Sequence, residues 1–166
     1  MTTKKTDKYS ASEQGLGYIY QARLALLHIL QLSEETAVFL EKDDDLDFID
    51  GDGGKSLASL KHKAVGDRLT DLATDFWKSV NIWLERYKRD GRSASSLQFF
   101  LFTTGTVSAD SFLARLLPDQ PVPSSDLAPL TELANASLAN SKSQLIATIA
   151  VSFNELSEPE KQDFLE

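Results

Sequence analysis

The hydrophobic period of this sequence changes near residue 37, and the change restricts the fold to a combination of helix and sheet. Apolar residues recur every three or four positions between residues 12 and 33, which is typical of an amphipathic helix. Three segments with strand character follow, at 37–41, 45–50 and 55–63. The stripe of the helix that we expect to be mostly buried consists of Leu16, Ile19, Tyr20, Arg23, Leu27 and Leu30.

A second long helix and a fourth strand are expected after these three strands. Between residues 72 and 87 the apolar residues are spaced by four, four, three and four, which predicts an amphipathic helix with Thr70 as its N-cap. Trp77 and Trp83 lie on this helix, and we expect both in the hydrophobic core. The segment 96–104 is almost continuously apolar, which favours a central strand covered on both faces. The predicted order of elements is α-β-β-β-α-β.

Length and composition fit one hydrophobic core. The chain has 166 residues, of which 42% are hydrophobic, and this is enough for one domain of ordinary size. We expect an α/β core over residues 1–106 and a helical extension over residues 107–166. A capping box at Ser157–Glu160 opens a helix only six residues before the sequence ends. We therefore expect the chain to lead into a further C-terminal region.

The composition excludes several classes of protein. There is no cysteine, which rules out disulfides and thiolate zinc sites. The two histidines, His28 and His62, lie 34 positions apart, which argues against a zinc hydrolase. No apolar run approaches the roughly 18 residues needed to cross a bilayer. We expect a cytoplasmic protein without membrane contact.

Charge is unevenly distributed along the chain. The formal net charge is −8, which argues against a general nucleic-acid coat. Residues 51–92 nevertheless carry nine basic and six acidic side chains, whereas the parts before and after them are acidic. This middle part is where we expect contacts with a phosphate-bearing partner.

Acidic and basic side chains lie on neighbouring strands of the predicted sheet. The segment 41–47 is rich in carboxylates, and the next strand carries lysines. Because strand side chains alternate, Ser59, Lys61 and Lys63 share one face and His62 lies on the other. Carboxylates can hold Mg²⁺, and a lysine can orient water and stabilise charge that develops on a phosphate. One interpretation is metal-dependent phosphodiester hydrolysis, and the other is a polar hairpin whose acidic stretch is only solvated.

Taken in this order, the segments resemble the restriction-endonuclease-like core of the PD-(D/E)xK superfamily, an α-β-β-β-α-β unit with a central mixed sheet. They look most like the double-stranded-DNA nuclease domain at the N-terminus of bacterial anti-phage effectors, over about residues 12–105. The resemblance implies an endonuclease that cleaves double-stranded DNA with little sequence specificity, as a homo-oligomer or with partner subunits of a defence complex. The segments that carry it are Gly15–Gln21, Val38–Asp45, Ser59–His62 and Leu69–Lys78.

The resemblance also implies roles for individual residues. Asp45, or its neighbour Asp44, would be the metal carboxylate at the start of the second strand, and Lys61 would be the catalytic lysine. Gln21 would approach the catalytic site from the first helix. Glu41 would be an accessory acid for catalysis and metal binding. The implied cofactor is Mg²⁺ or Mn²⁺.

The sequence departs from the family pattern two residues before the lysine, where Ser59 stands in place of Glu, Asp or Gln. A neutral hydroxyl is a weaker ligand for Mg²⁺ than a carboxylate. Two hypotheses follow from this difference. Either Glu41 compensates for the missing ligand, or the domain is catalytically degenerate and serves as a DNA-binding or assembly module.

Binding to DNA is expected to be largely electrostatic. Cationic side chains would contact phosphates, which carry no base information, so the affinity should fall steeply as salt is added. The residues that we assign to this contact are Lys55, Lys63, Arg68 and Lys78.

Overall fold

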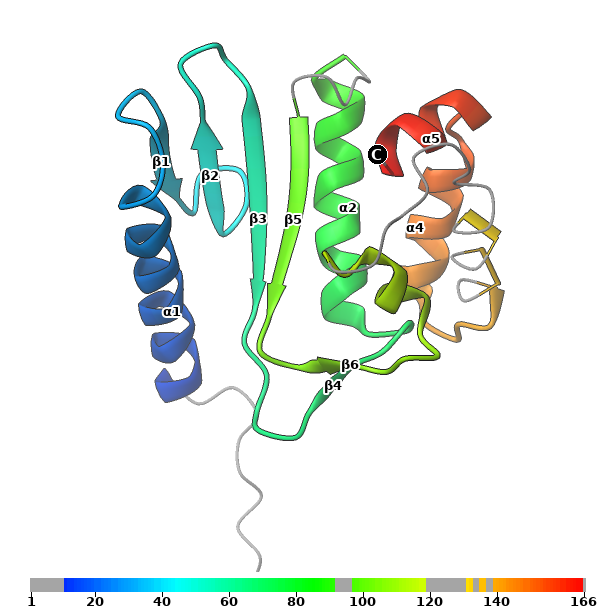
Figure 1. Cartoon of the computed structure of the whole chain (residues 1–166). Helices are drawn as coiled ribbons and strands as arrows, with labels where there is room; N and C mark the ends of the chain where they lie inside the picture. Colours follow the sequence, from blue (N-terminus) through cyan, green and yellow to red (C-terminus); the bar gives the residue numbers. More distant parts are fainter. Residues whose placement is uncertain (1–10, 92–96, 119–130, 133–134, 137–138, 166) are drawn as a thin grey trace, which may run out of the picture.

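A four-stranded mixed sheet forms the centre of the molecule, which we describe from a computed structural model (Figure 1). The strands are β1 Ala37–Leu40, β2 Leu46–Ile49, β3 Lys55–Lys61 and β5 Leu97–Thr103. β1 and β2 are antiparallel, as are β2 and β3, whereas β3 and β5 are parallel, which gives the order β1-β2-β3-β5. The predicted α/β class and mixed sheet are confirmed. The structure describes residues 11–91, 97–118, 131–132, 135–136 and 139–165.

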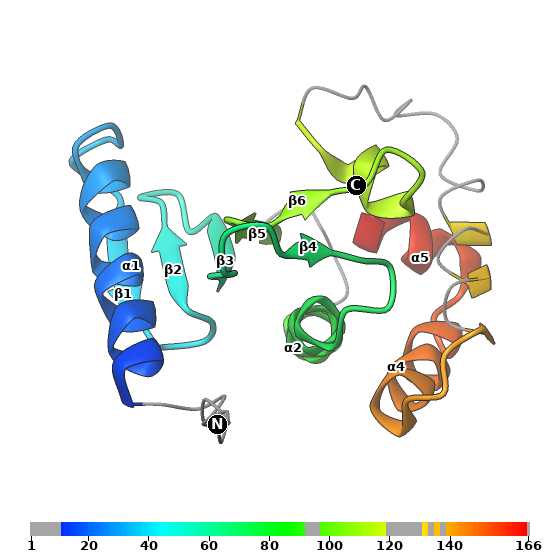
Figure 2. The ribbon, with the colours of Figure 1, turned by 90° about the horizontal axis from the view of Figure 1, so that it is seen from below.

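Helices cover both faces of this sheet (Figure 2). They are α1 Ala11–Ile29, α2 Thr74–Arg89, α4 Gln144–Asn154 and α5 Glu158–Leu165, with the 3-10 helix η2 Phe112–Leu116. On one face, Ala25 of α1 packs with Leu46 of β2 and Ala58 of β3. On the other face, Trp83 of α2 stacks on Phe99 of β5, with 5.4 Å between the ring centroids. The sheet therefore lies between α1 and α2, and α4 packs on α2.

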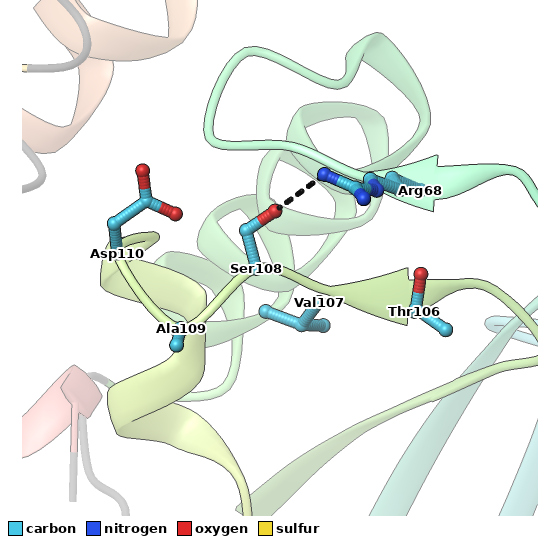
Figure 3. A pocket seen from close by; sticks show the side chains of 6 residues that line it. All are labelled: Arg68, Thr106, Val107, Ser108, Ala109 and Asp110. Atoms are coloured by element: carbon cyan, nitrogen blue, oxygen red, sulfur yellow. Dashed lines mark hydrogen bonds between the residues drawn. The ribbon is translucent and has the colours of Figure 1, made fainter.

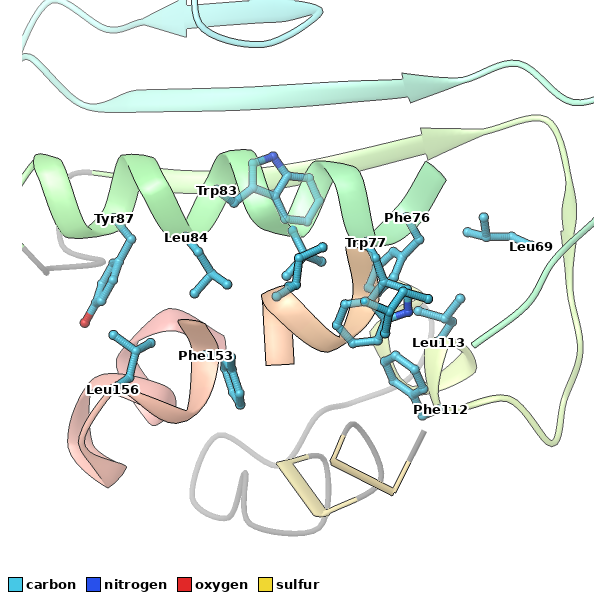
Figure 4. Close-up of a cluster of buried hydrophobic side chains, with 13 residues drawn as sticks. Leu69, Phe76, Trp77, Trp83, Leu84, Tyr87, Phe112, Leu113, Phe153 and Leu156 are labelled. Atoms are coloured by element: carbon cyan, nitrogen blue, oxygen red, sulfur yellow. The ribbon is translucent and has the colours of Figure 1, made fainter. Parts of the chain in front are cut away.

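The larger hydrophobic cluster joins α2 to the C-terminal helices (Figure 4). Trp77 and Trp83 are 4% and 8% exposed, which confirms the prediction that both tryptophans belong to the core. Ile149 of α4 and Phe112 of η2 belong to the same cluster. The helices after residue 106 therefore share one hydrophobic cluster with α2.

α1 forms where the sequence predicts it, but it turns a different stripe toward the sheet. Gln21 and Ala25 are buried, whereas Leu27 and Leu30 of the predicted stripe are 52% and 76% exposed. His28, on the buried side, packs against two phenylalanine rings of the sheet. The small side chain at Ala25 allows close packing against the strands, and this contact fixes the rotation of the helix. The leucine-rich stripe is left facing away from the sheet.

Three further features differ from the sequence prediction. β5, expected to be a central strand, lies at the edge of the four-stranded sheet and pairs only with β3 among the described strands. α2 begins at Thr74 instead of directly after Thr70, because a turn precedes it in which the Ala73 N–H donates to the Thr70 carbonyl at 2.9 Å. A short parallel pair joins β4, Arg68–Leu69, to β6, Thr106–Val107. Strands of two residues are too short to show a hydrophobic period, so the sequence pattern does not reveal them.

The C-terminal extension is helical where it is described. α5 begins after Ser157, whose N–H donates to the Glu160 carboxylate at 2.7 Å, as expected of a capping box. Among the helices of the described residues, none combines the length and the apolar character that a transmembrane span requires.

The shared cluster predicts that the C-terminal helices stabilise the part of the molecule against which they pack. Ile149 is 0% exposed, so Ile149→Ala should lower the free energy of unfolding by about 2–5 kcal/mol, the range for substitutions that leave a cavity. Urea unfolding followed by tryptophan fluorescence measures this change. Val151→Ala on the same helix is the control, because Val151 is 62% exposed. Equal effects of the two substitutions would contradict the shared core.

Candidate active site

Four of the predicted site residues meet at the end of β3. Gln21 comes from α1, Glu41 and Asp45 from the loop between β1 and β2, and Lys61 from the last position of β3. The Gln21 Nε2 atom donates to Glu41 Oε1 at 2.6 Å and to Asp45 Oδ1 at 3.0 Å. The Lys61 Nζ atom lies 3.8 Å from Asp45 Oδ2. We call these residues the four-residue cluster.

The backbone around β2 explains how Asp45 reaches this position. Antiparallel pairing of β2 with β3 ends where Leu46 faces Ala58, so the Leu60 N–H lies beyond the ladder. That N–H donates instead to Asp45 Oδ2. Glu41, at the other end of the loop, has a φ of 53°, a left-handed conformation that is uncommon for a residue other than glycine. Such backbone strain is concentrated at functional sites.

Asp44 lies apart from the four-residue cluster. Its Oδ2 accepts a hydrogen bond from the Trp83 indole N–H at 2.8 Å, and its Oδ1 accepts one from the Asp45 N–H at 2.9 Å. The side chain is buried, with 8% of the residue exposed. Asp44 therefore links the β1–β2 loop to α2, and Asp45 is the carboxylate that joins Gln21 and Lys61.

A partly buried ion network lies beside the loop, and sequence reasoning missed it. Asp43 pairs with both Lys55 and Arg86, and Lys55 Nζ also lies 3.9 Å from Asp47 Oδ2. Burial raises the pKa of Asp47, although two backbone N–H groups oppose this effect. Burial alone would also raise the pKa of Asp43, but Lys55 and Arg86 outweigh it and hold that pKa below its ordinary value. Lys55, predicted to contact DNA, thus has its charge balanced inside the protein.

Three lysines surround Asp75 near the start of α2. Lys63 forms an ion pair with this carboxylate. The hydrogen bond from Lys63 lowers the pKa of Asp75; burial opposes the change, and the charges of Lys63, Lys78 and Lys61 add to it. Lys78 is exposed. The catalytic lysine of our prediction therefore lies next to two of the cations that we assigned to DNA binding.

Arg68, the fourth predicted DNA contact, lines a separate pocket of about 400 Å³ between β4 and the loop after β6 (Figure 3). Its guanidinium lies 3.5 Å from the Ser108 hydroxyl, at the limit of a hydrogen bond. Asp110 belongs to the same pocket, so the pocket holds charges of both signs. Arg68 is exposed and free to contact a phosphate outside it.

Ser59 faces the same side of β3 as Lys61, as strand alternation predicts, but it is 0% exposed. Its hydroxyl lies 2.7 Å from the Ser79 hydroxyl of α2, and Ser79 in turn donates to the Asp75 carbonyl at 3.3 Å. On the opposite side, the His62 ring meets Tyr20 of α1 with 5.8 Å between centroids. The Ser59 hydroxyl is therefore used in packing β3 against α2 and does not point into the cluster.

The four-residue cluster offers oxygen ligands to a cation. Among the described residues, no three Asp, Glu, His or Cys side chains come together as a metal-holding group. Glu41 and Asp45 nevertheless converge on one nitrogen atom, and the Gln21 Oε1 atom beside them is buried and finds no hydrogen-bond partner in the described part of the chain. Carboxylate and amide oxygens are the ligands that Mg²⁺ and Mn²⁺ prefer. The residues present therefore fit such an ion.

The lowered pKa of Asp75 predicts a pH-dependent contribution to stability. Because the folded chain favours the charged carboxylate, the contribution is present above the ordinary pKa of 3.8 and is lost as the pH falls through the lower folded value. Asp75→Asn should therefore make the free energy of unfolding less sensitive to acid below about pH 4, with a loss at neutral pH of less than about 1 kcal/mol, since the carboxylate is 43% exposed. Urea unfolding at several pH values tests this.

Asp110→Asn, in the exposed loop after β6, is the matched control for this substitution. It should leave the acid sensitivity of the wild type in place. If Asp75→Asn and Asp110→Asn follow the same pH profile, the ion pair with Lys63 does not contribute to stability.

The chain was also compared with known proteins. No family model, no curated protein and no solved structure matches it. Its function must therefore be inferred from the geometry and chemistry of its own residues.

Proposed function

We propose that this chain is a metal-dependent endonuclease domain that cleaves double-stranded DNA with little sequence specificity. The observation that carries the proposal is the four-residue cluster: three separate segments bring two carboxylates, an amide and a lysine to one point. A polar hairpin that is merely solvated has no need of a buried glutamine between its carboxylates. Metal-dependent phosphodiester hydrolysis uses carboxylates to hold the metal ion and a cationic group to stabilise charge on the phosphate.

The sheet supports a restriction-endonuclease-like assignment. Three antiparallel strands follow α1, and β5 lies parallel to β3 after the crossover helix α2. Lys61 and Thr103 face each other at the carboxyl ends of the two parallel strands. Ligand sites of open α/β sheets are found at such ends.

Glu41, Asp45 and Lys61 have direct roles in the proposed reaction, and Gln21 positions the two carboxylates. Glu41 and Asp45 would hold Mg²⁺ or Mn²⁺, which when bound acidifies water and neutralises charge on the phosphate. The Oδ1 atom of Asp45 accepts the hydrogen bond from Gln21, and its Oδ2 atom is the one near the Lys61 ammonium group. The Asp45 carboxylate therefore lies between the amide and the ammonium group. From this position Lys61 would donate hydrogen bonds to the scissile phosphate and orient the attacking water.

The lysines around Asp75 supply the proposed contact with the DNA backbone. Lys78 is exposed, and Lys63 would exchange the Asp75 carboxylate for a phosphate. Arg68 would contribute from β4. Lys55 is left out of this surface, because Asp43 and Asp47 hold its ammonium group.

The setting that we propose is the bacterial cytoplasm, in an anti-phage effector that works as a homo-oligomer or with partner subunits. Two features support an assembly. The sheet ends in β1, a strand without charged residues, and α1 exposes a stripe of leucines. Monomeric proteins usually protect such edges and apolar surfaces.

A second candidate function is a degenerate nuclease fold that serves as a DNA-binding or assembly module. The observation that favours it is the buried Ser59 hydroxyl, which is bonded to Ser79 and adds no ligand to the cluster. This candidate differs from the first in one measurable property, because it does not cut DNA.

The proposed reaction predicts that cleavage of supercoiled plasmid by the 166-residue chain requires Mg²⁺ or Mn²⁺, Asp45 and Lys61. Asp45→Asn and Lys61→Ala should each lower the rate by about 100-fold or more, the range for a group that stabilises transition-state charge. Lys142→Ala, an exposed lysine before α4, is the control. Cleavage that survives both site substitutions would overturn the site, and DNA binding by an inactive wild type would favour the second candidate.

Affinity for double-stranded DNA should depend on salt through the exposed cations. Arg68→Ala and Lys78→Ala should each reduce the slope of log K against log salt by about one, uniformly across DNA sequences. Fluorescence anisotropy over a salt series measures the slope. Lys55→Ala should instead lower the free energy of unfolding, because it leaves Asp43 and Asp47 with less neutralising charge. If the salt slope is unchanged in both Arg68→Ala and Lys78→Ala, DNA binds at another surface of the protein.

A further inference from the structure

Gln21 carries a polar atom that the fold leaves unused. The residue is 8% exposed, and its Oε1 atom is buried with no hydrogen-bond partner in the described part of the chain. An unpaired buried acceptor costs about 1–3 kcal/mol, so such atoms are uncommon in folded proteins and require an explanation.

The nitrogen atom of the same amide lies where two carboxylates converge and a cation would be favoured. Gln21 Nε2 lies 2.6 Å from Glu41 Oε1 and 3.0 Å from Asp45 Oδ1, so it occupies the point where two carboxylates converge. An amide N–H₂ group carries only a partial positive charge, whereas two adjacent carboxylates attract a full one. The amide nitrogen therefore stands where a cation would be more strongly held.

We propose that Gln21 is a ligand of a divalent cation and that its amide reverses when the ion binds. The inference rests on the proposed function and extends it, since it names a metal ligand on α1. Rotation about the last side-chain torsion exchanges the positions of Oε1 and Nε2 without moving the helix. The oxygen then faces the same side as Glu41 and Asp45. The unpaired acceptor then gains the cation as its partner, while the Nε2 atom gives up its two carboxylates to the ion.

The surroundings hold Gln21 and Asp45 in place. Ala25, one turn after Gln21, is buried against the sheet, which fixes α1 in rotation. Tyr20 contacts the ring of His62, the residue after Lys61, and so ties this part of α1 to the end of β3. Asp45 is held by the Leu60 N–H. A set of ligands held by packing and hydrogen bonds binds its ion with less loss of freedom.

The ligand set also predicts which ions bind. Two carboxylates and an amide supply only oxygen, and no histidine or cysteine belongs to the cluster. Mg²⁺ and Mn²⁺ suit such ligands and complete their shells with water or phosphate oxygens. Ser59 contributes nothing, because its hydroxyl is bonded to Ser79.

Binding of Mn²⁺ to the 166-residue chain without DNA, followed by electron paramagnetic resonance of the free ion, tests the proposal. Gln21→Leu should weaken the affinity by about tenfold or more, the effect expected for residues that support a metal site. Gln21→Glu should bind Mn²⁺ at least as tightly as the wild type, since it keeps an oxygen in place and adds charge. Gln144→Leu, an exposed glutamine on α4, should leave the affinity unchanged.

Thermal unfolding and Mn²⁺ affinity together separate a ligand from a residue that only bridges the two carboxylates. If Gln21 is a ligand, Gln21→Glu should melt at a lower temperature than the wild type without metal, because three carboxylates converge, and should gain more on addition of Mn²⁺. If Gln21 only bridges, Gln21→Leu leaves Mn²⁺ affinity equal or higher, which overturns the proposal, as does a wild type that binds no Mn²⁺.

The plasmid assay distinguishes this inference from the proposed function. Mn²⁺ binding that depends on Gln21 in a protein that cuts no DNA would keep the ligand assignment and reject the nuclease. Cleavage combined with unchanged Mn²⁺ affinity in Gln21→Leu would keep the nuclease and reject the ligand.

Discussion

Repulsion among the five carboxylates of residues 41–47 is the constraint on which the rest of the structure depends. Like charges this close cannot share one environment without loss of stability, so the fold gives them different partners. Two ion pairs neutralise Asp43, a tryptophan N–H holds Asp44, and backbone N–H groups hold Asp47. Gln21 holds Glu41 and Asp45 together. These partners come from α1, β3 and α2, so neutralising one short loop fixes the positions of three other elements.

The same distribution separates structural carboxylates from those free to act. Asp44 and Asp47 are 8% and 0% exposed, and protein donors face them. Glu41 is exposed, and Asp45 is partly exposed next to Lys61. A solvated hairpin would leave all the carboxylates equivalent. The observed inequality leaves two carboxylates accessible beside a lysine, and the proposed reaction depends on this arrangement.

Strand alternation predicted much of this arrangement, because Ser59 and Lys61 share one face of β3 and His62, directly after the strand, lies on the other side. The α-β-β-β-α-β order followed from hydrophobic period in the same way. The rotation of α1 could not be predicted, since its leucine stripe is more apolar than the face that Ala25 buries. Nor could the pattern show that Asp43 and Asp47 neutralise Lys55. Neighbouring aspartates in one run look alike in the sequence, and only their contacts in the folded protein distinguish them. Both limits concern contacts between elements, which a local pattern does not contain.

The Ser59 position connects the packing of the sheet to the chemistry of the site. A glutamate there would lie against Ser79, where burial disfavours its charged form. The small hydroxyl instead permits α2 to pack closely on β3, and the site loses one negative charge from that side. As the proposed ligand, Gln21 on α1, on the opposite side of the sheet, would add an oxygen without adding charge. With Glu41, Asp45 and Lys61 the cluster then carries one net negative charge before any ion binds, so an added divalent cation leaves it positive toward a phosphate. In this way α1 can replace the ligand that β3 lacks.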